Sequence, residues 1–108
     1  MMGKNIRFSY ENAEYVLEFN RKSVEMLERR GFVAEDLVKA PMTNLPVLFH
    51  GAFQMHHKGM TIEKTNKILE NIKDTTGLIG KLAEMYSEPI MTLIDDTDEK
   101  NITWEASF

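Results

Sequence analysis

Apolar residues in the middle of the chain recur at the spacing of one helix face. They are Leu45, Leu48, Phe49, Ala52 and Phe53, which follow the i, i+3, i+4, i+7, i+8 pattern. The pattern predicts a helix over residues 44–58, with Thr43 or Asn44 as its N-cap and Pro46 in its first turn. At about 1.5–3 kcal/mol per buried large side chain, this stripe is expected to be the main hydrophobic anchor. The rest of the chain is therefore expected to pack around this helix.

Near the N-terminus, apolar and polar residues alternate, which is the pattern of strands rather than helices. Ile6, Phe8 and Tyr10 form the first set, and Tyr15, Leu17 and Phe19 form the second. Residues 11–14 lie between the two sets and are expected to form a short turn. The sequence therefore predicts a β-hairpin over residues 4–19 with one aromatic-rich face. Because a lone hairpin is marginal in water, that face must pack on the helices or gain another strand.

Capping residues and apolar periodicity predict further helices on both sides of the central one. Asn20 is a good N-cap and Gly31 is a typical C′ residue, so a helix is expected over about residues 20–31. Thr61 is the expected N-cap of another helix, over residues 61–73.

The last part of the chain predicts a long helix, a loop and a short strand. A broad apolar arc covers residues 75–94 and contains Pro89, where the helix is expected to kink or break. Residues 95–100 are acidic and are expected to form a loop. Over residues 101–107 apolar and polar side chains alternate, which predicts a strand. This strand would join the N-terminal hairpin or offer its edge to another chain.

These elements together predict an α+β fold that is mainly helical. It has about four helices, an N-terminal β-hairpin and a short C-terminal strand. The length of 108 residues predicts a single domain over residues 1–108, and the apolar content of 43% is enough to build a core.

Composition lowers the expectation of several function classes. A net charge of −4 opposes an electrostatic hold on DNA or RNA, which needs clustered lysine and arginine. The chain has no cysteine, so a disulfide framework, a thiolate nucleophile and a zinc ribbon are excluded. It also has no apolar run of transmembrane length and no signal-peptide core, so we expect a cytoplasmic protein that does not contact membranes.

Candidate chemistry is sparse. His50 and His57 lie seven residues apart, about 10 Å along a helix, which is too far for one metal ion. His56 is expected to be a buried neutral histidine with a hydrogen-bond partner. Asp96, Asp98 and Asn101 loosely resemble a calcium loop, but the required glycine and closing glutamate are missing. Since no catalytic or phosphate-binding motif is present either, we expect no metal, no cofactor and no enzyme activity.

Methionine is the residue type that most favours a role in binding. The chain has eight methionines, and methionine is common both in cores and at surfaces that accommodate varied partners. The partner-binding candidates are Met55, Met60, Met91 and Trp104. For Trp104, a place over the core is favoured about two to one over a role as interface anchor.

Three stretches, in this order and at this spacing, resemble one family. They are residues 16–32, which run from Val-Leu-Glu-Phe-Asn-Arg to Arg-Gly-Phe, residues 48–57 (Leu-Phe-His-Gly-Ala-Phe-Gln-Met-His-His) and residues 82–89 (Leu-Ala-Glu-Met-Tyr-Ser-Glu-Pro), followed by Trp104. Together they are similar to the small tail assembly chaperones of long-tailed bacteriophages of Gram-positive hosts and their prophages. The resemblance implies a mainly helical protein that binds the tape measure protein, keeps it soluble during tail assembly and then leaves. It supplies no catalytic residues.

Several alternatives stay open at this point. In many such phages a ribosomal frameshift adds a C-terminal part, so a longer form of this chain is one alternative. A structural tail or connector component that stays in the virion is another. A regulator that binds nucleic acid is a third, which the acidic balance opposes. Self-association into a homo-oligomer is compatible with a free strand edge and a high methionine content.

Overall fold

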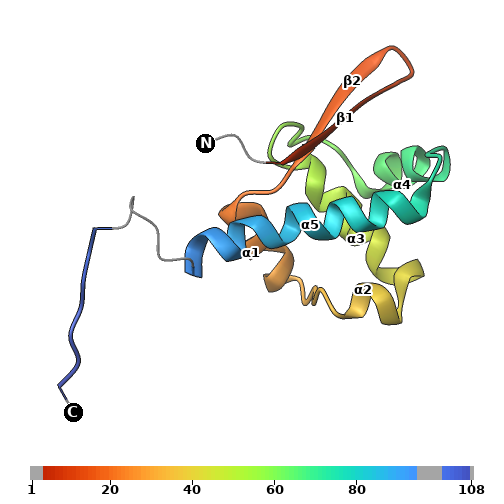
Figure 1. Cartoon of the computed structure of the whole chain (residues 1–108). Coiled ribbons are helices and arrows are strands. Elements are labelled where there is room, and N and C mark those ends of the chain that lie inside the picture. The colour runs from red at the N-terminus through yellow and green to blue at the C-terminus, as the bar shows by residue number, and fades with distance from the viewer. Residues whose placement is uncertain (1–3, 95–100, 108) are drawn as a thin grey trace.

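The computed structural model describes residues 4–94 and 101–107 and has an α+β fold that is mainly helical, as predicted (Figure 1). The elements in chain order are β1 (Asn5–Tyr10), β2 (Ala13–Glu18), α1 (Arg21–Arg29), α2 (Asp36–Lys39), α3 (Pro41–Phe53), α4 (Ile62–Glu70) and α5 (Thr75–Ile94). The hairpin lies at one end of the group of helices, and α3 passes through the middle of that group. The predicted acidic loop over residues 95–100 lies outside the described residues.

The hairpin is tighter than the sequence suggested. β1 and β2 pair antiparallel with Phe8 opposite Tyr15 and Tyr10 opposite Ala13, so only two residues form the loop. These two, Glu11 and Asn12, have φ angles of 49° and 66°. Positive φ at both central residues is typical of a type I′ turn, whose twist matches that of the strands. The prediction of a turn over residues 11–14 was therefore two residues too long.

α1 has the caps that the sequence indicates. The Asn20 side chain accepts a hydrogen bond from the backbone N–H of Ser23 at 2.8 Å, and the Ser23 hydroxyl accepts one from the backbone N–H of Asn20 at 2.9 Å. This reciprocal pair is a capping box. Gly31 follows the last turn with a φ of 89°, a left-handed conformation that glycine adopts without steric cost.

The central helix α3 has different ends from those predicted. It begins at Pro41 rather than at residue 44, and it ends at Phe53 rather than at residue 58. Asn44 does not cap the helix, because its side-chain amide donates to the carbonyls of Asp36 and Ala40, at 3.1 and 2.9 Å. Pro46 accordingly lies inside the helix and not in its first turn.

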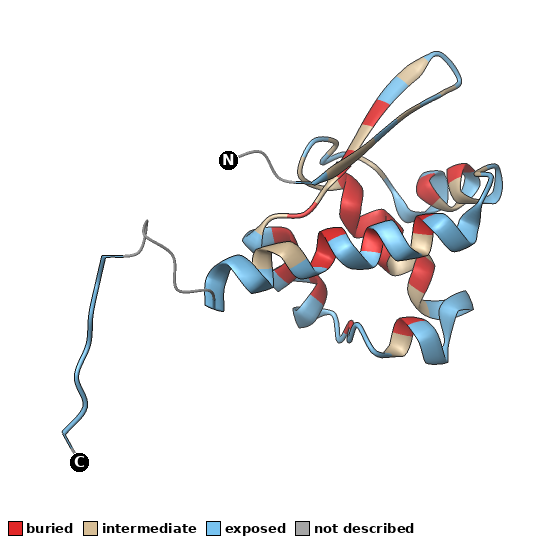
Figure 2. Ribbon diagram, viewed as in Figure 1, coloured by how far each residue is buried: buried red, intermediate tan, exposed pale blue. Residues whose placement is uncertain are grey.

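The predicted stripe of α3 is the centre of the core. Leu45, Leu48, Phe49, Ala52 and Phe53 are all buried (Figure 2). The Phe53 ring packs edge-on against Phe8 and Tyr15 of the hairpin and against Phe49 one turn earlier, with centroid separations of 6.2, 5.6 and 5.1 Å. Such edge-to-face pairs add about 0.5–1.5 kcal/mol each to the effect of burial. The aromatic face of the hairpin is thus anchored on α3.

The two following helices agree with the sequence in part. α4 is capped by Thr61 as expected but ends at Glu70, three residues before the predicted end. α5 has the predicted bounds, Thr75–Ile94. The helix does not break at Pro89, since it continues to Ile94. One missing backbone hydrogen bond is therefore tolerated in a helix whose preceding turns are held by the core.

The predicted C-terminal strand is wrong for the residues that the structure describes. Residues 101–107 have no strand or helix, and the sheet consists of β1 and β2. The side chains of Ile102 and Trp104 are 86% and 82% exposed, so the expectation that Trp104 covers the core is also wrong. Alternation indicates which side chains could share a face, but it does not supply the partner strand that would bury them.

Candidate functional site

The apolar stripe of α5 extends beyond the part of the helix that the core covers. Its first part is buried at Leu78, Leu82, Met85 and Tyr86. Beyond Pro89, the side chains of Ile90, Met91, Leu93 and Ile94 are 38%, 51%, 52% and 67% exposed. At about 100° per residue, these four positions occupy about 160° of the helix circumference. Large apolar side chains that gather on one surface in this way are typical of interaction sites.

A groove runs between this end of α5 and α1, and we call it the α1–α5 groove. It has a volume of about 260 Å³ and is lined by Arg21, Val24, Glu25, Glu28, Pro89, Ile90 and Leu93. Val24 is 5% exposed and forms part of its floor. The apolar side belongs to α5, whereas α1 contributes both signs of charge. The groove therefore suits a partner segment with an apolar stripe and mixed charges beside it.

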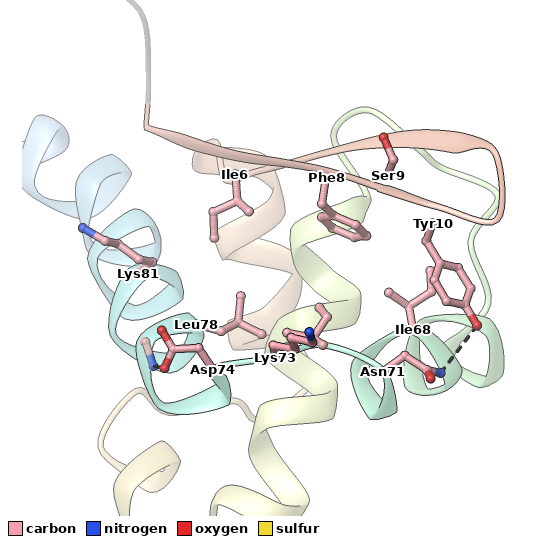
Figure 3. A pocket seen from close by; sticks show the side chains of 12 residues that line it. Ile6, Phe8, Ser9, Tyr10, Ile68, Asn71, Lys73, Asp74, Leu78 and Lys81 are labelled. Carbon is pink, nitrogen blue, oxygen red and sulfur yellow. Dashed lines mark hydrogen bonds between the residues drawn. The ribbon is translucent and has the colours of Figure 1, made fainter.

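A larger groove lies beneath the hairpin, and we call it the hairpin groove. Its volume is about 480 Å³, within the range of ligand-binding clefts. The lining residues are Ile6, Phe8, Ser9, Tyr10, Ile68, Asn71, Ile72, Lys73, Asp74, Gly77, Leu78 and Lys81. Figure 3 shows Ile6, Phe8 and Tyr10 pointing from β1 into the groove, with Ile68 and Leu78 facing them from α4 and α5.

Polar groups are confined to the rim of the hairpin groove. The Asn71 amide donates to the Tyr10 hydroxyl at 3.5 Å (Figure 3). Desolvation, and to a smaller extent the Glu11 carboxylate, raises the pKa of Tyr10 above its ordinary value. The Asp74 carboxylate accepts the backbone N–H of Gly77 at 3.1 Å, in the first turn of α5. Its charge is thus partly engaged by the helix N-terminus, so the rim next to α5 carries the positive charges of Lys73 and Lys81.

An ion pair joins the start of the hairpin to α5. The Lys4 ammonium lies 2.7 Å from the Glu84 carboxylate, and both side chains are about half exposed. This hydrogen bond raises the pKa of Lys4 and lowers the pKa of Glu84. Because the pair is exposed, its contribution to stability is small and depends on salt.

The four partner-binding candidates from the sequence do not form one site. Met55 is half-buried and lines a third hollow, of about 500 Å³, next to α1, together with Met26. Met60 is partly buried and packs against the core. Met91 lies on the exposed end of α5, and Trp104 lies in the extended C-terminal segment. Neither of the two grooves described above was predicted from the sequence. The alternation in residues 6–10 did predict which side chains of β1 face inward.

The histidines hold the segment after α3 in place. His50 is buried and donates from Nε2 to the carbonyl of Met60 at 2.9 Å. His57 Nε2 accepts the backbone N–H of Val16 at 3.0 Å, on the outer edge of β2. His56 is exposed and contacts the Glu18 carboxylate at 2.9 Å, so the expectation that His56 is the buried histidine is wrong. The structural reason is that α3 ends before residue 56, so His56 no longer follows the apolar face.

Over residues 4–94 and 101–107, no group of three or more His, Cys, Asp or Glu side chains could hold a metal ion. In those residues no helix has the length and apolarity needed to cross a bilayer.

Comparison with known families places the chain. A family model described as a domain of unknown function, DUF5055, matches residues 2–108. The chain belongs to the DUF5055 family. Searches of curated proteins and of solved structures gave no match to this DUF5055 chain. Since the family description states no activity, function has to be argued from the surfaces described above.

Proposed function

We propose that this DUF5055 chain is a tail assembly chaperone of a long-tailed bacteriophage or prophage. It binds apolar helical segments of the tape measure protein in the host cytoplasm, keeps them soluble and leaves before the tail is complete. The proposal involves no bond-making chemistry. It is supported by the resemblance of residues 16–32, 48–57 and 82–89, which fall mainly on β2, α1, α3 and α5.

The observation that carries the proposal is the uncovered apolar end of α5 beside α1. A helix of the partner could place residues at i, i+3 and i+4 against Ile90 and Leu93, with its polar flanks against the charged side chains of α1. The partner would then cover the end of the apolar stripe on α5, just as the core covers the first part of that stripe. Binding would use the same packing that stabilises the fold.

The size of the surface favours reversible binding. A fully buried large apolar side chain contributes about 1.5–3 kcal/mol, and side chains that start half-buried supply about half of that. The four exposed residues of α5 would thus supply on the order of 3–6 kcal/mol, which is comparable with the entropic cost of association. A complex held mainly by this surface is expected to dissociate readily, as a chaperone that departs requires.

The test is co-expression with the tape measure protein from the same genome. Wild-type chain is expected to raise the soluble fraction of that protein and to co-purify with it. Ile90→Glu places a charge in the groove and is expected to abolish both effects. Thr92→Glu is the matched control, because it adds the same charge at an exposed position of α5 that lies outside both the groove and the apolar arc. It should behave as wild type.

Three results would contradict the proposal. The first is a tape measure protein whose solubility and co-purification do not change with the wild-type chain. The second is an equal loss of binding in Ile90→Glu and Thr92→Glu, with circular dichroism showing both folded. The third is the presence of the chain in purified phage particles by mass spectrometry, which would indicate a structural tail component instead.

A further inference from the structure

The two edges of the hairpin differ: the edge of β2 is partly occupied by His57, and the edge of β1 borders the hairpin groove. Because the loop has two residues, the flanking Tyr10 and Ala13 form a hydrogen-bonded pair. Hydrogen-bonded and non-hydrogen-bonded pairs alternate along an antiparallel ladder, so the backbone N–H and C=O groups of every second residue point away from the partner strand. On β2 the outward N–H of Val16 is taken by His57. On β1 the corresponding residues are Arg7 and Ser9. In the part of the chain that the structure describes, no strand lies beyond β1. Their backbone groups are therefore available to another strand.

The open edge borders the hairpin groove, so a strand added there would have one face directed into it. In a strand, side chains at i, i+2 and i+4 share a face. Ile6, Phe8 and Tyr10 of β1 follow this spacing and point into the groove (Figure 3). An added strand with three apolar side chains at the same spacing would lie beside them, above Ile72 and Leu78. The geometry selects an extended segment with alternating apolar residues.

The C-terminal segment, residues 101–107, has this pattern, and all of its residues are exposed. It places Ile102, Trp104 and Ala106 at alternate positions, separated by Thr103 and Glu105. It has no helix or strand and runs as a drawn-out segment (Figure 1), and the Ile102 and Trp104 side chains are 86% and 82% exposed. The chain therefore displays both an apolar strand-like segment and an apolar groove next to an open strand edge, and it does not join them within one copy.

Charge also favours this pairing. The rim of the groove carries Lys73 and Lys81, and the Asp74 carboxylate is bonded to the start of α5. The incoming segment carries Glu105, and the sequence just before it, residues 95–100, contains four acidic residues and one lysine. An acidic segment is thus matched to the lysines at the α5 end of the rim, in a chain whose net charge is −4.

We propose that the hairpin groove binds the C-terminal segment of a second copy of this chain. The segment adds as a strand to the edge of β1, and Trp104 enters the groove. Because each copy has one groove and one segment, two copies exchange segments reciprocally and form a closed dimer. This proposal does not depend on the chaperone role, and the surface that it uses is separate from the α1–α5 groove.

Trp104 is the only tryptophan, so its fluorescence reports directly on the segment. The full-length chain is diluted in steps, and its emission wavelength and its mass by sedimentation are followed together. We expect a dimer with blue-shifted emission at high concentration and a monomer with red-shifted emission at low concentration, with one common midpoint. A blue-shifted monomer at every concentration would mean that the segment occupies its own groove and would overturn the proposal. So would a Trp104 that stays solvent-exposed in the dimer.

Charge reversal at the rim provides a variant that leaves the core untouched. Lys73→Glu/Lys81→Glu is expected to raise the dimer dissociation constant at least tenfold. Lys39→Glu/Lys64→Glu is the control, because it makes the same charge change at exposed lysines that do not line the groove, and it should shift the constant less than threefold. Trp104→Ala, which lies outside the folded core, should prevent dimerisation. A dimer that forms equally well in Trp104→Ala, or equal weakening by both lysine pairs, would contradict the proposal.

Discussion

A close approach at Gly51 provides a test of the packing between α1 and α3. Gly51 lies on α3, and a methyl group added there would lie 2.7 Å from Leu27 Cδ1 and 3.0 Å from Leu27 Cγ. Leu27 is 1% exposed, so its side chain is surrounded by other residues of the core. Gly51→Ala therefore introduces a clash at the centre of the molecule. Gly80→Ala on α5 is the matched control, because a methyl group there has no neighbour within 4 Å.

The two substitutions are expected to change stability in opposite directions. Replacing a helical glycine by alanine gains about 0.5–1 kcal/mol from backbone entropy, and Gly80→Ala should show this gain. At Gly51 the same gain is opposed by overpacking, which costs about 1–3 kcal/mol. The free energies of unfolding of the two variants should thus differ by about 1–3 kcal/mol. At about 4–8 °C per kcal/mol, the difference in melting temperature is at least several degrees.

Urea unfolding followed by circular dichroism measures the difference, and a double-mutant cycle identifies its cause. If Leu27 is the clashing partner, Leu27→Ala should destabilise Gly51→Ala less than it destabilises the wild type, by about 0.5 kcal/mol or more. Gly51→Ala as stable as Gly80→Ala, or a cycle with no coupling, would refute the proposed contact between the two helices.

Two further predictions concern a buried tyrosine and a helix cap. Burial, helped by the Glu28 carboxylate, raises the pKa of Tyr86 to about 12. The contribution of Tyr86 to the free energy of unfolding should be constant below about pH 10, where the tyrosine of the unfolded chain begins to ionise. Above that pH the free energy of unfolding should fall by at most about 1.4 kcal/mol per pH unit, up to about pH 12. Tyr86→Phe should lose this slope in alkaline urea titrations, and an unchanged slope would exclude the assignment. Asn20→Ala removes the capping box and should lower the free energy of unfolding by about 1 kcal/mol in urea. Unchanged stability would show that the box is dispensable.

Features that depend on neighbours in the sequence were predictable. The capping box needs only Asn20 and Ser23, three residues apart, and the central stripe needs only the 3.6-residue period of α3. Competition between two possible hydrogen-bond partners of one side chain was harder to predict. Asn44 is a good N-cap by type, but its amide bonds to carbonyls of the preceding turn, and the start of α3 moves to Pro41.

The candidate surfaces depend on which element covers which, and periodicity does not contain that information. Leu82 and Ile90 belong to the same apolar arc of α5, yet one is fully buried and the other is 38% exposed. The difference arises because the core ends near Pro89. In the same way, the alternation around Trp104 is strand-like, but whether a strand edge receives it is decided by the tertiary arrangement.

Hydrogen–deuterium exchange on the co-purified complex with the tape measure protein tests the central claim most directly. Comparison with the free chain should show slower amide exchange in α1 and in residues 85–94, while α4 exchanges at an unchanged rate. Protection confined to β1 and α4, or no change along the whole chain, would contradict the assignment of the α1–α5 groove as the partner-binding surface.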